Sequence, residues 1–327
     1  MSRPLCKVGR RGLLAGAIAM PLAAQAQTWS PDRPVRMLVG FPPGGVTDVI
    51  ARIAGDGMAQ RLGQPVIVDN RAGAAGNIAA AAVARATPDG QTILMATNNS
   101  HGANPALYAN AGFDPVRDFT PIALLATITN VLVVHPSVPA TTVAELIALT
   151  KARPGTFNFA SASVGSAGHL VGEMFKSRTG ADITHITYRG AAPAQADVVA
   201  GRVQMLFGTL QTVLEPVRAG QLRALAVTSL QRMPQLPDVP TMAETVLPGF
   251  SADAWFALFG PAGMSPAAVT RLNEAARAAM EDSTLRSRLT DQGFIISVSS
   301  PAELGAFVPL EVAKWGEAVR LSGARAE

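Results

Sequence analysis

The feature that most constrains this chain is a strand, a tight loop and a helix that follow one another between residues 35 and 61. The apolar run 35–39 is typical of a buried strand, and apolar residues recur at helical spacing after position 45. The glycine- and proline-rich loop at 40–45 leaves backbone N–H groups free at the start of the helix, where the helix dipole favours an anion. Thr47 and Asp48 are suitable capping residues there. The stretch predicts either an anion-binding loop or an ordinary turn.

The same loop does not carry a nucleotide-binding motif. Gly40 and Gly45 have the glycine spacing of a Walker A loop, but Val46 and Thr47 stand where that motif has lysine and a hydroxyl residue. The loop also lacks the G-x-G-x-x-G pattern of dinucleotide-binding folds. We therefore expect no nucleotide and no other cofactor.

Residues 1–26 are predicted to be a signal peptide. Four cations precede an apolar segment at 12–22, and a small-x-small site allows cleavage after Ala26. The apolar segment is too short to span a bilayer. The pattern predicts export to the periplasm of a Gram-negative-type cell, by either the Sec or the twin-arginine route.

Removal of that segment changes the charge and the cysteine content. Of the 27 cations, four lie in the segment, so 27 − 4 = 23 cations remain beside 23 acids. A mature chain without net charge is not expected to bind nucleic acid. The single cysteine, Cys6, also lies in the segment, so the mature chain is expected to contain no disulfide and no cysteine ligand or nucleophile.

Strand and helix patterns alternate along the rest of the chain, which predicts an α/β protein with mainly parallel sheets. About 300 residues are enough for two domains with separate cores. We place domain 1 at 27–127 plus 253–327 and domain 2 at 128–252. This division makes domain 1 discontinuous, with the last helices returning to it.

A second loop, at residues 161–168, is also a candidate anion-binding loop. Small hydroxyl residues and glycines stand between a predicted strand and a predicted helix. Their hydroxyl groups and backbone amides offer several neutral hydrogen bonds to one carboxylate, and two facing helix N-termini would hold an anion without a cationic side chain. The alternative is a plain turn.

The candidate nucleophiles lie in this second loop. Neither Ser163 nor Ser166 stands in a G-x-S-x-G motif. An exported serine hydrolase that uses Ser166 and His169 remains the alternative function. His169 and Glu173 share a helix face but lack the H-E-x-x-H pattern, so no metal site is expected.

Motifs along the whole mature chain resemble those of the Bug family, the periplasmic substrate-binding proteins of tripartite tricarboxylate transporters. They are, in chain order, F-P-P-G-G-x-x-D-x-x-A-R at 41–52, N-R-A-G at 70–73, P-D-G at 88–90, N-P-x-L-Y at 104–108, A-S with G-S and H-L between 160 and 170, Y-R-G-x-x-P at 188–193, G-x-L-R-A-L-A-V-T at 220–228, L-P-D-V-P-T at 236–241 and P-A-G at 261–263. No single motif is specific to the family, but the occurrence of all of them in this order is.

The resemblance implies a type II-like periplasmic binding fold, in which two domains close on a small organic acid without catalysis. One carboxylate would lie between the loops 41–48 and 161–166, partly through ordered water, and more variable residues would contact the other end of the ligand. The resemblance implies these ligand-binding residues: Phe41, Pro43, Gly44, Thr47, Asp48, Asn98, Asn99, Ser161, Ser163, Val164, Gly165, Ser166, Tyr188, Thr209 and Asp253. Ser100 and Arg189 are further candidates by position.

Three residues near the predicted cleft bear on ligand specificity. Ser163 stands where the family commonly has glycine, and Arg189 stands where it usually has lysine. Arg189 would either pair with a second carboxylate or be a solvated surface residue. Asp253, if it faces the cleft, would disfavour a dianion and favour an amine or hydroxyl group.

The leading hypothesis is a monomeric binding protein that delivers a small carboxylate to a membrane permease or informs a sensor. Dicarboxylates, aromatic carboxylates and amino acids all remain possible ligands. Besides the hydrolase, the other alternative is a protein that only binds a protein partner.

Overall fold

The computed structural model of the protein describes residue 1 and residues 29–326. The predicted signal peptide, apart from its first residue, lies outside the described residues. Among the described helices, none has the length and apolar content that a membrane span requires.

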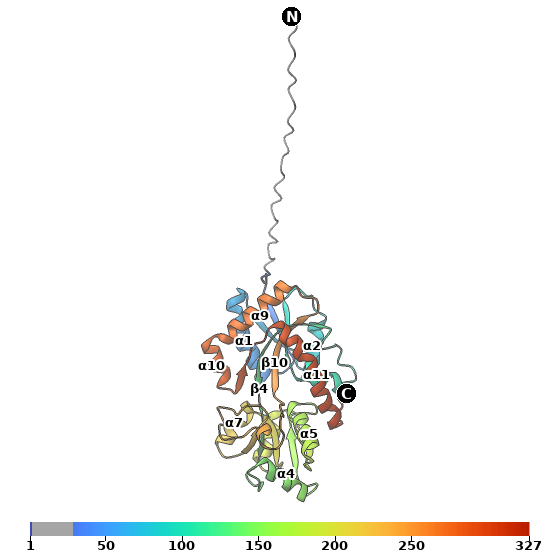
Figure 1. The fold of residues 1–327 in the computed structure, drawn as a ribbon, viewed down its shortest axis with the longest axis vertical. Coiled ribbons are helices and arrows are strands. Elements are labelled where there is room, and N and C mark those ends of the chain that lie inside the picture. Colours follow the sequence, from blue (N-terminus) through green and yellow to red (C-terminus); the bar gives the residue numbers. More distant parts are fainter. Residues whose placement is uncertain (2–28, 327) are drawn as a thin grey trace.

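The described residues form two β-sheets, which lie at opposite ends of the molecule with helices around each (Figure 1). The first sheet has the strand order β11-β4-β10-β3-β1-β2. Its strands are β1 (Val35–Val39), β2 (Val66–Asn70), β3 (Thr92–Thr97), β4 (Phe119–Ile128), β10 (Ala254–Pro261) and β11 (Phe294–Ile296). The helices that pack around it are α1 (Val46–Leu62), α2 (Asn77–Ala84), α9 (Pro266–Glu281), α10 (Ser283–Thr290) and α11 (Pro301–Ser322). Every residue of β10 is buried, because this central strand is covered on both faces.

The second sheet has the strand order β7-β6-β8-β5-β9. Its strands are β5 (Asn130–Val134), β6 (Asn158–Ser161), β7 (Thr184–Thr187), β8 (Met205–Thr209) and β9 (Arg223–Val227). The helices in this part of the chain are α4 (Val143–Ala152), α5 (Ala167–Thr179), α6 (Ala191–Val199), α7 (Leu210–Arg218) and α8 (Met242–Thr245). Together the two sheets and their helices confirm the predicted α/β class.

The chain passes between the two sheets twice. Only Thr129 separates β4 from β5, and the chain returns to the first sheet just before β10. Hydrogen bonds join the outgoing and returning segments: Thr228 N donates to Asn130 O at 2.8 Å, and Asn130 Nδ2 donates to Ala252 O at 2.9 Å. The two connections therefore form one hydrogen-bonded unit.

The sheets are mixed, whereas the sequence predicted mainly parallel ones. Among the described strands, four of the nine pairings are parallel and five are antiparallel. The two connections between the sheets explain the difference. A strand that continues directly from one sheet into the other needs no crossover helix, so β4 and β5 run antiparallel to the strands that they pair with, β10 and β8 among them.

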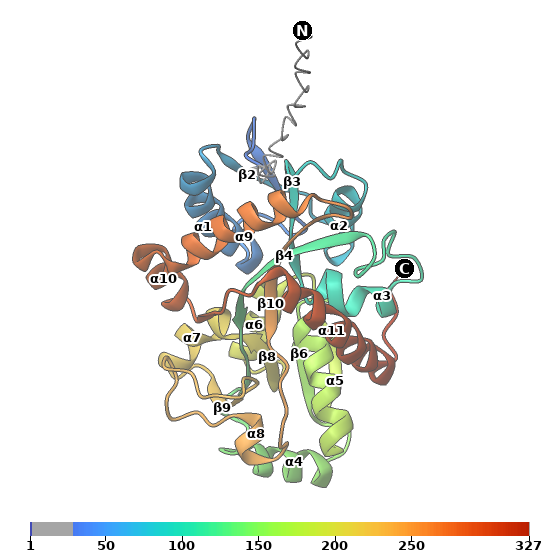
Figure 2. The ribbon, with the colours of Figure 1, turned by 45° about the horizontal axis from the view of Figure 1, so that its top comes forward.

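Helix α11 contacts both halves of the molecule. The sequence predicted that the last helices pack on domain 1, and α11 does contact β4, but it also lies along α5 beside the second sheet (Figure 2). Buried Glu311 of this helix accepts hydrogen bonds from Trp255 Nε1 at 2.8 Å and from Trp315 Nε1 at 2.7 Å. The long C-terminal helix is thus anchored to β10 while its surface contacts α5.

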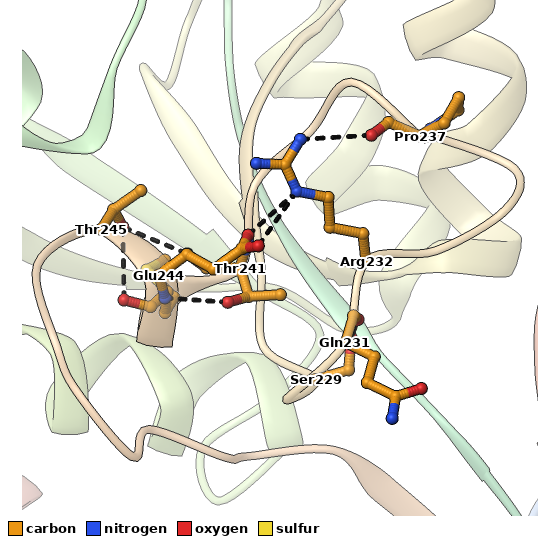
Figure 3. A network of polar contacts seen from close by, with 8 residues as sticks. Ser229, Gln231, Arg232, Pro237, Thr241, Glu244 and Thr245 are labelled. Carbon is orange, nitrogen blue, oxygen red and sulfur yellow. Dashed lines mark hydrogen bonds and ion pairs between the residues drawn. The ribbon is translucent and has the colours of Figure 1, made fainter.

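A short helix interrupts the segment 234–249, whose prolines are typical of a connecting loop. Helix α8 begins at a capping box in which the Thr241 hydroxyl accepts from Glu244 N and the Glu244 carboxylate accepts from Thr241 N. Figure 3 shows that Arg232 also reaches Glu244, and its Nε lies 3.0 Å from Oε2. A capping box predicts a helix start, and here it was overlooked because prolines surround it.

Candidate functional site

A cavity of about 150 Å³ lies at the carboxyl ends of β6 and β8, where open α/β sheets place their ligands. Three helices, α5, α6 and α7, contribute residues from their first turns. The wall is formed by Asn130, Ala160, Ser161, Ala162, Ser166, Ala167, Gly168, Ala191, Ala194, Gln195, Leu206, Phe207, Gly208, Thr209 and Thr212.

The three helices that begin at the cavity share one feature. Their N-cap residues are Ser166, Gly190 and Thr209, and in none of them does the N-cap side chain accept a hydrogen bond from the helix. Helices α1, α2 and α3 also lack such a cap, whereas α4, α8, α9, α10 and α11 all have a side chain that caps their first turn. The first N–H groups of a helix have no partner within the helix. In α7, however, Leu210 N already donates to Thr129 O at 2.9 Å, and the third residue of α6, Pro193, has no N–H group. The first N–H groups of α5 have no partner among the described residues, so they remain free to donate to a bound group.

The loop that precedes α5 is held by its own hydrogen bonds. Ser161 Oγ donates to Ser163 O at 3.0 Å, and Ser166 Oγ donates to the same carbonyl oxygen at 2.7 Å. Gly165 N donates to His169 Nδ1 at 3.0 Å. Because these protons are already engaged, the donors that face an anion here are the backbone N–H groups of Ala167 and the residues that follow it.

Two stacked imidazole rings lie behind this loop. The ring centroids of His169 and His185 are 3.9 Å apart, and His185 Nε2 lies 2.7 Å from Ser161 Oγ. Burial lowers the pKa of His169 to about 3 and that of His185 to about 4. Both rings are therefore neutral near pH 7, and they shape the loop by hydrogen bonding and stacking rather than by charge.

The first predicted loop has a different arrangement, because Asp48 turns into it. One carboxylate oxygen of Asp48 accepts from Gly44 N and from Arg52 Nε, both at 2.9 Å, and the other accepts from Asn70 Nδ2 at 2.9 Å. Burial acts to raise the pKa of Asp48, but these hydrogen bonds outweigh it and hold the pKa below its usual value. The Asp48 carboxylate thus holds the loop before α1 but does not cap the first N–H groups of the helix, while Pro43 and Gly44 are exposed at the loop surface.

The segment after β3 connects the two loops. It forms a π-helix, η2 (Asn99–Ala103), followed by the short α3 (Asn104–Leu107), and neither was predicted from the sequence. Asn99 Nδ2 donates to Gly165 O at 3.0 Å, so a residue next to the first sheet contacts the loop before α5. Asn98 and Ser100 are buried on either side of it. π-Helical turns are frequent at functional sites.

The remaining predicted residues lie in several places. Thr209 is on the cavity wall, whereas Ser163 and Val164 are exposed, Phe41 is half-buried and Thr47 is buried.

Two further candidates make contacts of their own. The Tyr188 hydroxyl donates to Asp197 Oδ2 at 2.7 Å, and burial, together with this contact, raises the pKa of Tyr188 to about 12. Asp253 accepts from Thr228 Oγ1 at 2.8 Å in the connection between the sheets, and burial raises its pKa. Arg189 is exposed and does not belong to the cavity wall.

The structure therefore brings Ser161, Ser166 and Thr209 together on one wall. It adds residues that the sequence reasoning missed, chiefly Asn130, Gln195 and Thr212. The sequence signal for the α6 residues is Gly190 followed by Pro193, which is typical of a helix start, but nothing local shows that the helix points at this cavity.

Comparison with known proteins places this geometry in a family. Residues 50–323 match the sequence model of the tripartite tricarboxylate transporter family receptor. The chain belongs to this family. It is 37% identical to Protein BugT of Bordetella pertussis over 326 residues, which is 99% of both chains.

Solved structures agree with this assignment. A Rhodopseudomonas palustris protein with adipate is 36% identical, with a TM-score of 0.81 over 90% of this chain and 99% of that one. MatC of the same organism, with bound malate, is 34% identical, with a TM-score of 0.78 over 88% of this chain and 99% of that one. Members of the family are substrate-binding proteins of the periplasm, not enzymes. This confirms the resemblance and the predicted fold class, and it overturns the serine hydrolase alternative.

Proposed function

We propose that this family member captures a small organic carboxylate in the cavity at the starts of α5, α6 and α7 and hands it to a tripartite tricarboxylate-type permease or to a sensor. The observation that carries the proposal is the set of helix N-termini that meet at the cavity without side-chain caps. Their N–H groups and dipoles favour an anion. The adipate and malate found with two similar solved structures support a carboxylate as the anion.

In this proposal the carboxylate contacts the first turn of α5 from Ser166 to Gly168. The loop at 41–48 approaches from the other side, with Phe41, Pro43 and Gly44 at its surface and Asp48 holding its shape from inside. Asn99 supports the cavity through its contact with Gly165. Closure brings the domains 27–127 plus 253–327 and 128–252 together on the ligand.

The cellular setting belongs to the same proposal. The signal peptide is cleaved after Ala26, and the mature chain acts in the periplasm as a monomer. No cofactor, metal or nucleic acid takes part in binding. The permease subunits remain a prediction that rests on the family.

A thermal-shift screen of the mature chain tests the function. The protein is unfolded, dialysed and refolded to remove any ligand acquired during expression, and it is then heated with mono- and dicarboxylates, aromatic acids and amino acids. A ligand at a hundredfold excess over its dissociation constant adds about 2.7 kcal/mol to the free energy of unfolding, which raises the melting temperature measurably. At least one carboxylate is expected to do so. If none does, while the refolded protein melts cooperatively, the proposed function is wrong.

A further inference from the structure

The cavity wall carries no charge. None of its fifteen residues has an ionisable acid or base as its side chain, and most are alanine, glycine, serine or threonine. A carboxylate bound at the helix N-termini is compensated by N–H groups and helix dipoles. A second charged group deeper in the cavity would lose its hydration without gaining a partner, which is strongly unfavourable.

The cations of the facing loops are engaged elsewhere. Arg52 Nε is 2.9 Å from Asp48 Oδ2, and Arg71 Nε is 3.1 Å from Asp69 Oδ2. Arg189 follows the strand that ends beside the cavity, but its side chain is exposed and outside the wall. The cavity is therefore built to hold one negative charge at its mouth and an uncharged group inside.

Asn130 adds a polar requirement to this uncharged wall. The residue is 1% exposed, and its Nδ2 donates to Ala252 O at 2.9 Å, which fixes the orientation of the amide. Its Oδ1 is buried and has no hydrogen-bond partner among the described residues. Buried polar atoms are nearly always hydrogen-bonded, and an amide oxygen can only accept. The atom is shielded from solvent, so a ligand group that donates a hydrogen bond would satisfy it after a small shift of the wall.

The volume of the cavity sets the size of the part of the ligand that lies within it. A closed protein cavity of 150 Å³ accommodates a benzene ring, so a cavity of about 150 Å³ holds a body of about six heavy atoms. The walls contributed by Ala160, Ala191 and Ala194 are apolar, which suits a hydrocarbon chain or ring between the two polar ends.

We propose that the ligand is a monocarboxylate whose uncharged body of about six heavy atoms ends in a hydrogen-bond donor such as a hydroxyl group. This inference rests on the proposed function and narrows it. The carboxylate lies at the start of α5, the body fills the cavity, and the donor contacts the Asn130 carbonyl oxygen. Dicarboxylates of the same length bind more weakly because their second charge enters an uncharged wall.

Isothermal titration calorimetry on the refolded mature protein tests this order of affinities with ligands that differ only at the end distant from the bound carboxylate. The flexible series is hexanoate, 6-hydroxyhexanoate and adipate, and the rigid series is benzoate, 4-hydroxybenzoate and terephthalate. In the series that binds more tightly, we expect the hydroxy acid to bind about fivefold tighter than the acid without a donor, as one neutral hydrogen bond allows. The dicarboxylate is expected to bind at least about tenfold more weakly than the hydroxy acid.

A substitution in the cavity wall tests whether the absence of charge there causes this preference. Gln195→Lys introduces a cation on α6, and it should tighten the binding of the dicarboxylate about tenfold or more while weakening the preference for the hydroxy acid. Gln195→Met is the matched control, since it fills similar space without a charge and should give no such gain. Circular dichroism and melting curves confirm that both variants fold.

The outcomes separate this inference from the function on which it rests. If the wild-type protein binds the dicarboxylate more tightly than the hydroxy acid, the inference is wrong, and loss of that binding in Arg189→Gln would identify the exposed arginine as the second carboxylate's partner. If another acid from the screen binds best, two carboxylates in that acid overturn the inference, and one carboxylate with a donor supports it. If no carboxylate binds at all, the proposed function fails instead.

Discussion

The two strand–loop–helix units, at residues 35–62 and 158–179, differ in the surroundings of the start of their helix. At α1, Asp48 accepts from Gly44 N and is paired with Arg52. At α5, the Ser166 side chain does not cap the helix, and its first turn opens on a cavity. Both loops look like anion sites in the sequence. Neither helix has a side-chain cap, so the difference lies in the surroundings: an uncapped helix N-terminus becomes a candidate anion site where a cavity opens on it.

The largest loss of ligand affinity is expected from a substitution at Gly168, at the end of the second loop. A Cβ atom at Gly168 would lie 2.4 Å from Phe207 O, which is backbone of β8 and cannot move aside. Gly168→Ala should therefore displace the start of α5 and weaken ligand binding about a hundredfold or more, as measured by calorimetry.

Gly44 in the first loop provides the matched control. Its φ is +81°, but a Cβ there would meet no atom within 4 Å. Gly44→Ala should cost about 1–2 kcal/mol of stability from the left-handed backbone conformation, with a much smaller loss of affinity. Equal losses of affinity in the two variants would contradict the distinction between the loops.

A second prediction concerns the acid inside the first loop. Asp48→Asn removes the charge that Gly44, Arg52 and Asn70 contact, and it should lower the free energy of unfolding by about 1–3 kcal/mol in urea titrations. The pKa of Asp48 is lowered in the folded protein, so its contribution is present above the unfolded pKa of about 3.9 and is lost as the pH falls through the folded pKa.

The difference in stability between wild type and Asp48→Asn should therefore shrink as the pH falls from about 5 toward 3. A difference that stays constant over this range would show that the charge of Asp48 does not hold the loop.

The smallest effect is expected on the pH dependence of stability, from the two stacked histidines behind the second loop. The folded pKa values of His169 and His185, about 3 and about 4, lie below the unfolded value. The unfolded chain thus binds more protons below about pH 6.5, and stability falls as the pH decreases from there. Each histidine contributes at most about 1.4 kcal/mol per pH unit.

His185→Gln, which retains a side-chain N–H for Ser161, should reduce this slope between pH 6 and 5. Buried His101 has a pKa lowered to about 3 and contributes in the same range in both proteins, so the difference between the two curves is the quantity to measure. Identical curves would show that His185 takes up protons equally in the folded and unfolded chain, so that folding does not lower its pKa.

Local patterns predicted the elements well where capping or alternation defines them. The capping boxes at Thr142 and Ser300 mark the starts of α4 and α11, and β1 occupies the predicted residues 35–39. Strand direction was less predictable, because the antiparallel pairing of β10 with β4 results from the returning connection rather than from any local signal.

The candidate site was predictable only in part. Loop composition identified Ser161 and Ser166, whereas Gln195 and Asn130 join the cavity through tertiary placement of α6 and of the connection between the sheets. The internal role of Asp48 was also hidden, since a carboxylate in the first turn of a helix has the same sequence whether it turns inward or toward a ligand.

One measurement tests the central claim, that backbone N–H groups at the start of α5 hold the anion. Ala167 and Val46 are the first residues of α5 and α1, and proline is tolerated there because that N–H has no partner within the helix. The residues before them, Ser166 and Gly45, are already extended, as proline requires. Each substitution therefore deletes one N–H group with little cost to the fold.

Calorimetry of Ala167→Pro and Val46→Pro with the strongest ligand from the screen gives the answer. The account predicts that Ala167→Pro loses about 1.5–3 kcal/mol of binding free energy, the value of one hydrogen bond to a charged group, while Val46→Pro changes it by less than about 0.5 kcal/mol. Unchanged binding in Ala167→Pro, or an equal loss in Val46→Pro, would contradict it.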